Sequence, residues 1–345
     1  VSDTFLDSAW YFLAYPLVGT KIWEKNSTPG SAEKVFDNEI VDSWLPVDLY
    51  FGGAEHAVLH LMYARFITMV LSDLKYINFD EPFPNFFAHG LMIKDGSKMS
   101  KSRGNVVNPD EYIEKYGADT LRLYLMFMGP MDGYPDFRDT GIEGMRRFVD
   151  RLWRLFVEHH DNVYVGEKQA RQLITKMHQT IKKVTRDIQS YSYNTAIAAL
   201  MEYVNLLREI AQTGSRKVKG KKVRCAQWSE ALSNLALLLA PFAPHIAEEV
   251  WKKFNSGSKK ATLASIHLHP WPEYIGKLTK EKTLTIPIQV NGKLRSTIRI
   301  GRSRAMDKSY VLEKARKDKK IGRWLKGKKI KKEIFIPARL VNLVV

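Results

Sequence analysis

The sequence contains one cysteine, Cys225, among 345 residues. A single thiol excludes an intramolecular disulfide and a cysteine-rich zinc site, and it is typical of a protein in a reducing cytosol. No apolar run approaches the roughly 20 residues of a membrane-spanning helix, so we expect no membrane association. The opening residues, VSDTFLDSAW, lack a starting methionine and the basic and apolar segments of a signal peptide. We therefore expect a cytoplasmic protein whose first residues belong to the interior of a longer chain.

Acidic residues are scarce near the C-terminal end. Residues 281–345 carry 19 of the 54 Lys and Arg residues but only five of the 37 Asp and Glu residues, and hence most of the net charge of +17. Such segregation favours a polyanion-binding element, and nucleic acid is the expected polyanion. The alternative interpretation is a basic face that only meets solvent.

The first 93 residues alternate strand-like and helix-like patterns. Residues 47–53, VDLYFGG, predict a short apolar strand that ends in two glycines, and residues 54–74 have the apolar spacing of a helix. A strand that leads through glycines into a helix is typical of nucleotide-binding α/β units. Residues 86–93, FFAHGLMI, predict a second buried strand.

Helical patterns dominate the middle of the chain and predict an antiparallel bundle. The tail then reads as strand, strand, helix and strand, which predicts a small α+β domain. The expected fold class is therefore α/β, followed by an all-α helical bundle and a small α+β C-terminal domain. The clearest helical patterns cover residues 144–159, 175–189, 193–212 and 229–254.

A polar basic loop, KDGSKMSKSRGN, follows the second predicted strand at residues 94–105. Lys98 and Lys101 are flexible point charges suited to polyphosphate. Serine hydroxyls add donors, and Gly96 and Gly104 allow the backbone to move or to approach a ligand closely. By composition alone, phosphate binding and an inert solvated loop are equally open.

The string KMSKS at 98–102, which runs into SRGN after an α/β segment, resembles the signature loop of class I aminoacyl-tRNA synthetases. Isoleucyl and valyl enzymes share the loop, but their C-terminal ends differ from this one. They are the alternative within the class. The surrounding segments are similar to leucyl-tRNA synthetases along essentially the whole chain: residues 3–12, 45–66, 105–124, 193–205, 237–251, and the terminal pattern IPIQVNGKLR…IPARLVNLVV within 286–345.

The resemblance implies a fold and a set of functional residues. Residues 1–93 would be the second half of a Rossmann-type catalytic domain, 94–140 the loop with a stem-contact region, 141–274 a helical anticodon-binding-type domain with a linker, and 281–345 a basic tRNA-binding domain. Lys101 would contact the ATP phosphates with support from Lys98. The other implied contacts are Gly53, Glu55, His60 and Met92 for ATP; Phe5, Ser8, Tyr11, His56 and His60 for leucine; and Lys293 and Arg295 for tRNA.

Each of these residues also has a plainer interpretation. Phe5, Ser8 and Tyr11 are spaced three apart, so on one helix they would share a face and could be an aromatic core stripe. His56 and His60 are four apart on the predicted helix and could be core residues. A zinc pair is a weaker possibility, because Glu55 precedes the pair and no third ligand is evident.

The resemblance also implies a reaction and partners. Leucine would be activated with ATP and Mg²⁺ to leucyl-adenylate and then transferred to tRNA(Leu). The sequence lacks a His-x-Gly-His element and the inserted editing domain, so we expect it to need the N-terminal part of the synthetase and to be inactive alone. The alternative is a tRNA-binding fragment without chemistry.

Overall fold

The structure is a computed structural model, which describes residues 4–26, 36–159, 163–214, 226–255, 264–280 and 283–345. Cys225 lies outside the described residues. The chain divides into two compact units, residues 1–150 with 187–198 and residues 151–186 with 199–345. Each unit is described by itself. The domain boundaries expected from the sequence stay predictions.

The first unit begins with helices that pack around a two-stranded parallel sheet. Strands β1 (Tyr50–Gly53) and β2 (Phe86–His89) pair in register, with Tyr50 opposite Phe86 and Gly53 opposite His89. Phe12, Leu13, Val41 and Phe83 are among the buried side chains of its core. The helices are α1 (Thr4–Ser8), α2 (Tyr11–Ala14), η1 (Tyr15–Leu17), α3 (Lys21–Asn26), α4 (Asn38–Trp44), η2 (Ala54–Ala57) and α5 (His60–Asp73).

Two sequence expectations about this part need correction. The helix expected over residues 54–74 is divided into η2 and α5. The second strand ends at His89, because Gly90 turns the chain against another backbone segment. Its amide donates a 2.8 Å hydrogen bond to Met131 O, and a Cβ at Gly90 would lie 1.6 Å from Gly133 O. Met92 therefore lies between strands rather than within one.

A second small sheet carries the basic loop. Its three strands are ordered β4–β3–β5, with β3 (Ile93–Lys94) antiparallel to β4 (Ser97–Lys98) and parallel to β5 (Asp136–Phe137). The loop continues into the 3₁₀ helix η3 (Lys101–Arg103), which ends at Gly104 in the left-handed conformation. Asn108 then caps α6 (Pro109–Tyr116), because its side-chain oxygen accepts from the Asp110 N–H. Helix α7 (Ala118–Phe127) follows.

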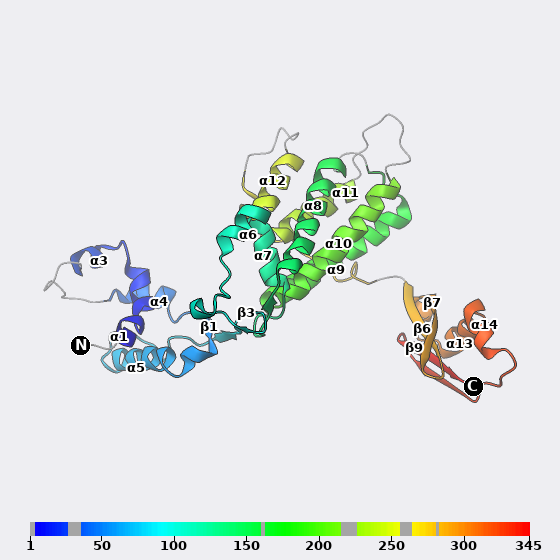
Figure 1. Cartoon of the computed structure of the whole chain (residues 1–345), viewed down its shortest axis with the longest axis horizontal. Coiled ribbons are helices and arrows are strands. Elements are labelled where there is room, and N and C mark those ends of the chain that lie inside the picture. The colour runs from blue at the N-terminus through cyan, green and yellow to red at the C-terminus, as the bar shows by residue number, and fades with distance from the viewer. Residues whose placement is uncertain (1–3, 27–35, 160–162, 215–225, 256–263, 281–282) are drawn as a thin grey trace. The chain divides into compact units, whose positions relative to one another are not determined.

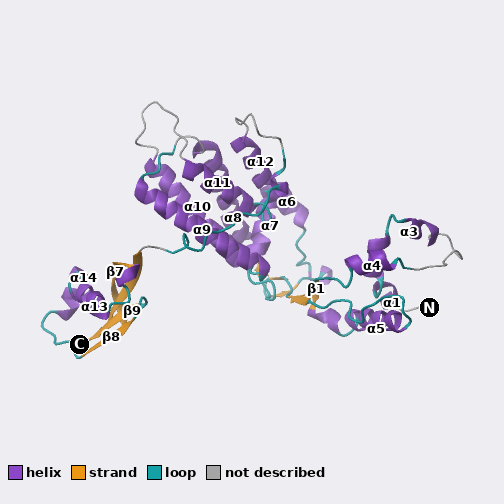
Figure 2. Ribbon diagram, turned by 180° about the vertical axis from the view of Figure 1, so that it is seen from behind, coloured by secondary structure: helices purple, strands orange, loops and turns teal. Residues whose placement is uncertain are grey.

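The helical middle of the chain is confirmed, with one change. The single helix expected over residues 229–254 is two helices, since Pro241 and Pro244 interrupt it; Pro244 is the first residue of the second. The buried faces of the helices are rich in Leu, Ile, Val and aromatic side chains. Figure 2 shows the long helices in purple. The elements are α8 (Asp139–His159), α9 (Glu167–Gln189), α10 (Tyr193–Gly214), α11 (Ala226–Leu239), α12 (Pro244–Asn255) and η4 (Ile266–Leu268).

The C-terminal segment folds as a four-stranded sheet of order β7–β6–β9–β8 with two helices packed on it (Figure 1). The expected helix is divided where Asp318 caps a second helix. The expected last strand is a hairpin, which turns at Ala338 with φ 56°. The elements are β6 (Thr283–Val290), β7 (Lys293–Gly301), η5 (Arg302–Arg304), α13 (Lys308–Arg316), α14 (Lys319–Leu325), β8 (Lys332–Ile336) and β9 (Leu340–Val344).

Within the described ranges, no helix combines the length and the apolar character required to cross a bilayer.

Candidate functional site

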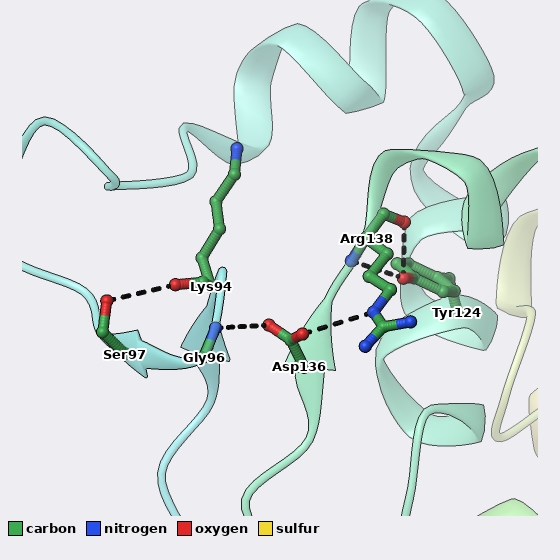
Figure 3. Close-up of polar contacts among 6 residues, drawn as sticks. All are labelled: Lys94, Gly96, Ser97, Tyr124, Asp136 and Arg138. Atoms are coloured by element: carbon green, nitrogen blue, oxygen red, sulfur yellow. Dashed lines mark hydrogen bonds and ion pairs between the residues drawn. The ribbon is translucent and has the colours of Figure 1, made fainter.

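The first half of the basic loop is a tight β-hairpin. Asp95 (φ 54°) and Gly96 (φ 72°) form a two-residue turn between Lys94 and Ser97, both in the left-handed region, as a type I′ turn requires. Gly96 therefore serves a fixed turn rather than a swinging backbone. The Ser97 hydroxyl also donates to Lys94 O at 3.4 Å (Figure 3).

A series of polar contacts connects this hairpin through β5 to Tyr124 of helix α7 (Figure 3). The Gly96 N–H donates to Asp136 Oδ1 at 3.4 Å, and Asp136 Oδ2 accepts from Arg138 Nε at 3.2 Å. The backbone of Arg138 then meets the hydroxyl of Tyr124, which donates to Arg138 O at 2.7 Å and accepts from Arg138 N at 3.0 Å. Burial raises the pKa of Tyr124, so its hydroxyl keeps the proton that it donates.

The second half of the loop is held by one side chain, Asn105. Its Oδ1 accepts a 2.8 Å hydrogen bond from the Ser100 N–H. Its Nδ2 donates to Ser97 Oγ at 3.2 Å, Lys98 O at 3.3 Å and Lys94 O at 3.4 Å. The hydroxyls of Ser100 and Ser102 are 2.8 Å apart. The amide thus joins Lys98 and Ser100 of the KMSKS segment to the preceding hairpin.

Lys98 and Lys101 project from this ordered loop. Both residues are exposed. Within the part of the chain that the structure describes, neither forms an ion pair with a carboxylate. The loop therefore offers two positive charges without an internal counter-ion, an arrangement suited to an anionic ligand.

A second cluster joins three of the N-terminal elements of the first unit. The hydroxyls of Tyr11 and Tyr50 are 2.7 Å apart, and the Tyr50 hydroxyl is 2.7 Å from His60 Nε2. Burial, and then the neighbouring His56, lowers the pKa of His60 and keeps the ring neutral near pH 7. Burial raises the pKa of Tyr50, so its hydroxyl keeps the proton that it donates. With His60 Nε2 as the acceptor, the Tyr50 hydroxyl donates to His60 and the Tyr11 hydroxyl donates to Tyr50.

The structure brings some predicted pocket residues together and separates others. Tyr11 and His60 lie face to face, with ring centroids 6.4 Å apart, and the His56 and His60 rings are 6.3 Å apart. Phe5 stacks on Tyr63 at 5.8 Å instead, and the Ser8 hydroxyl donates to Phe5 O. The single helical face expected for Phe5, Ser8 and Tyr11 is wrong, because α1 ends at Ser8 and α2 begins at Tyr11.

Gly53 and Glu55 are close to each other at the end of β1. A Cβ added at Gly53 would lie 2.1 Å from Glu55 Oε2, so the carboxylate occupies the space that glycine leaves. His56 lies in η2 and His60 begins α5, so the two are not on one continuous helix as expected. No group of three or more metal-ligating side chains was found among the described residues.

In the tail, Lys293 and Arg295 have different surroundings. Lys293 is exposed at the start of β7. The guanidinium of Arg295 lies 3.5 Å from the centre of the Trp324 ring, and its Nε is buried with no hydrogen-bond partner among the described residues. Arg295 is therefore already engaged in packing within its own domain.

Sequence reasoning missed Asn105, Asp136 and Tyr50. The Asp-Gly pair at 95–96 was a usable signal for a hairpin, and Asn105 stood at the end of the quoted loop. Asp136 and Tyr50 gave no local signal, because Asp136 accepts from Gly96, 40 residues earlier, and Tyr50 meets Tyr11, 39 residues earlier.

Comparison with known proteins gives a consistent result. A family model described as tRNA synthetases class I (I, L, M and V) matches residues 24–133, and one for the anticodon-binding domain of tRNA ligase matches residues 170–323. Leucine–tRNA ligases of Petrotoga mobilis and Thermotoga petrophila are 41% and 43% identical over 99% of the chain. The chain spans about 40% of their length.

Solved structures of aminoacyl-tRNA synthetases are also similar to this chain. A ternary complex of Agrobacterium radiobacter K84 LeuRS with tRNA and LeuAMS is 34% identical over 99% of this chain and 42% of that one, with a TM-score of 0.73. Methionyl-tRNA synthetase of Mycobacterium tuberculosis, bound by methionyl-adenylate, is 20% identical over 63% of this chain, with a TM-score of 0.53, and shows the fold alone.

Proposed function

Since the chain belongs to the class I aminoacyl-tRNA synthetases and is homologous to their leucine–tRNA ligases, we propose that it supplies part of the machinery that activates leucine and attaches it to tRNA(Leu). The observation that carries the proposal is the KMSKS segment, in which Asn105 orders a loop whose Lys98 and Lys101 pair with no carboxylate of the described residues. A solvated surface loop has no need of such order.

In the proposed first step, a leucine carboxylate oxygen bonds to the α-phosphorus of ATP, the bond to the bridging oxygen breaks, and pyrophosphate leaves. The carboxylate is already a nucleophile, so the protein supplies position and charge stabilisation. Lys101 would bind the polyphosphate, with Lys98 beside it. In the second step the 2′-hydroxyl of the terminal tRNA adenosine attacks the leucyl carbonyl carbon, and AMP leaves.

The described residues fit a Mg²⁺ that is held mainly by the nucleotide. No cluster of three acidic or histidine ligands was found among them. Magnesium often binds through substrate phosphates with only one or two carboxylates. When bound, the ion would neutralise phosphate charge beside the two lysines.

We assign leucine recognition to the cluster around Tyr11 and His60. The aromatic rings offer an apolar wall, and the ordered hydrogen bonds through Tyr50 fix their positions. Phe5, Ser8 and His56 remain candidates for the same pocket. Gly53, Glu55 and Met92 remain candidates for ATP.

The basic charge of the C-terminal domain supports the proposal that this domain binds tRNA. Lys293 is the exposed candidate for a phosphate contact, whereas the stacking of Arg295 on Trp324 favours a supporting role for it. The location in the cytosol, expected from the single cysteine, stays a prediction.

The site is proposed to be completed by the remaining part of the synthetase. Helix α5 and the residue before it expose an apolar stripe at helical spacing: Leu59, Met62, Phe66 and Met69 are 48%, 59%, 60% and 42% exposed. Parallel sheets are normally covered on both faces. The chain spans about 40% of the length of its relatives. We propose that the N-terminal part of the synthetase covers this stripe.

Complementation tests the proposal. The chain is mixed with the N-terminal part of a leucine–tRNA ligase, and leucine-dependent ATP–pyrophosphate exchange is measured. Exchange only in the mixture supports an enzyme subunit. ATP–pyrophosphate exchange by the chain alone would refute the prediction that the chain needs the N-terminal part. If the mixture binds tRNA but shows no exchange, the chain is better explained as an RNA-binding fragment. Isoleucine or valine in place of leucine distinguishes the related enzymes.

A further inference from the structure

The two strands of the parallel sheet present different side chains on their two faces. Successive residues of a strand point to opposite sides. Tyr50 and its neighbour Phe86 lie on one side, where Tyr50 meets His60. Phe51 and Phe87 also pair across the strands, with ring centroids 4.9 Å apart, and lie on the other side. The side behind the candidate leucine pocket is therefore aromatic.

One residue from a distant turn packs against that aromatic face. Tyr191, between α9 and α10, makes edge contacts with both rings, at 5.0 Å from Phe51 and 4.9 Å from Phe87. Residues 187–198 belong to the same compact unit as the sheet. The three rings form one cluster that joins β1 and β2 to this turn.

The backbone at Tyr191 adds independent support. Its φ is 55°, in the left-handed region that glycine adopts freely and that is unfavourable for a bulky side chain. The turn is held by a 2.7 Å bond from the Ser192 N–H to Asp187 O and by the Thr195 hydroxyl, which donates to the buried Asp187 carboxylate. A tyrosine in a position that suits glycine indicates that its ring contributes something glycine would lack.

We propose that Tyr191 is a positioning residue, which holds β1 and β2 from behind and so fixes Tyr50 and its bond to His60. The importance of this for leucine recognition rests on the proposed function. The contact itself does not.

Hydrogen exchange of the full chain tests the contact. In Tyr191→Gly, which relieves the backbone but removes the ring, amides of residues 50–53 and 86–89 should exchange at least about 10-fold faster, while helix α11 keeps its protection. Tyr191→Phe should behave as the wild type. Lys75→Gly, at another left-handed position (φ 64°), is the matched control for the backbone change and should leave the sheet unaffected. Unchanged protection of both strands in Tyr191→Gly would overturn the inference.

A second readout separates this inference from the proposed function. In the complemented enzyme, Tyr191→Gly should raise the KM for leucine about 10-fold, and Tyr191→Phe should not. If the wild-type mixture shows no leucine-dependent exchange, the proposed function fails, and hydrogen exchange alone decides the inference. If the wild type is active and Tyr191→Gly keeps its KM for leucine, the positioning role is wrong.

Discussion

The side-chain oxygen of Asn105 accepts a hydrogen bond from the backbone N–H of Ser100 at 2.8 Å. This bond ties the middle of the KMSKS segment to the residue that follows its 3₁₀ turn, and Lys98 and Lys101 remain exposed. Loops that bind phosphate gain from such order, because less conformational freedom is lost when the ligand binds.

Asn105→Ala should weaken ATP use more than leucine use. Losing the amide frees the loop, and we expect a rise in the KM for ATP of about 10-fold, as for an organising hydrogen-bond network worth about 1.4 kcal/mol. The measurement is leucine-dependent exchange by the complemented enzyme at varied ATP. Asn105→Asp is the comparison, since it keeps the acceptor for Ser100 and loses the donors. An unchanged KM for ATP in Asn105→Ala would exclude an organising role.

His60 should make stability depend on pH. Burial, and then His56, lowers the pKa of His60 in the folded chain below the ordinary 6.5. At a pH between the lowered pKa and 6.5, the unfolded chain therefore binds a proton at His60 that the folded chain does not. The free energy of unfolding should therefore fall as the pH drops below about 6.5, and His60→Gln should reduce that fall. Denaturant unfolding at pH 7.5 and 5.5 measures it. His178, whose pKa burial also lowers, keeps the remaining dependence in the variant.

The exposed His267 provides the control for that experiment. His267→Gln should retain the wild-type loss of stability at the lower pH. If His60→Gln and the wild type lose the same stability at the lower pH, burial does not lower the pKa of His60 in the folded chain.

The two basic residues of the tail should respond differently to substitution. Lys293→Ala should reduce the salt dependence of tRNA binding by about one unit of slope for a lost phosphate contact, with little change in stability. Arg295→Ala should destabilise the C-terminal domain by about 0.5–1 kcal/mol, because its stacking on Trp324 is lost. Binding at several salt concentrations and thermal unfolding separate the two effects. Equal behaviour of the two variants would contradict this division.

The sequence predicted the element types better than their interruptions. The helices of the bundle followed from their periodic apolar residues. The division of the last bundle helix could have been predicted from Pro241 and Pro244. The end of β2 could not, because Gly90 turns against a backbone segment more than 40 residues later.

The candidate site shows the same limit. The loop lysines were recognisable as a local string, whereas what holds the loop and the pocket was not. Asp136 reaches Gly96 only when β3 pairs with β5, and Tyr50 joins Tyr11 to His60 only when α2, 39 residues earlier, lies beside β1. Long-range partners of this kind leave no periodic pattern in a single sequence.

The exposed stripe of α5 predicts a separation of stability from assembly. Phe66→Glu places a charge on a side chain that is 60% exposed, so the melting temperature of the isolated chain should change little. In the complemented enzyme the charge would be buried without a partner, and association should weaken at least about 10-fold. Pull-down with the N-terminal part measures this. Phe66→Leu is the apolar control, and association of Phe66→Glu at wild-type strength would show that the stripe stays in solvent.

The most direct test of the account is leucine-dependent ATP–pyrophosphate exchange by the complemented enzyme with Lys101→Ala. Removing one group that stabilises transition-state charge should lower the rate about 100- to 1000-fold, while Lys115→Ala, an exposed lysine outside the loop, should leave it unchanged. The folded chain should retain its melting temperature in both variants. Exchange at the wild-type rate in Lys101→Ala would contradict the claim that this loop binds the phosphates of ATP.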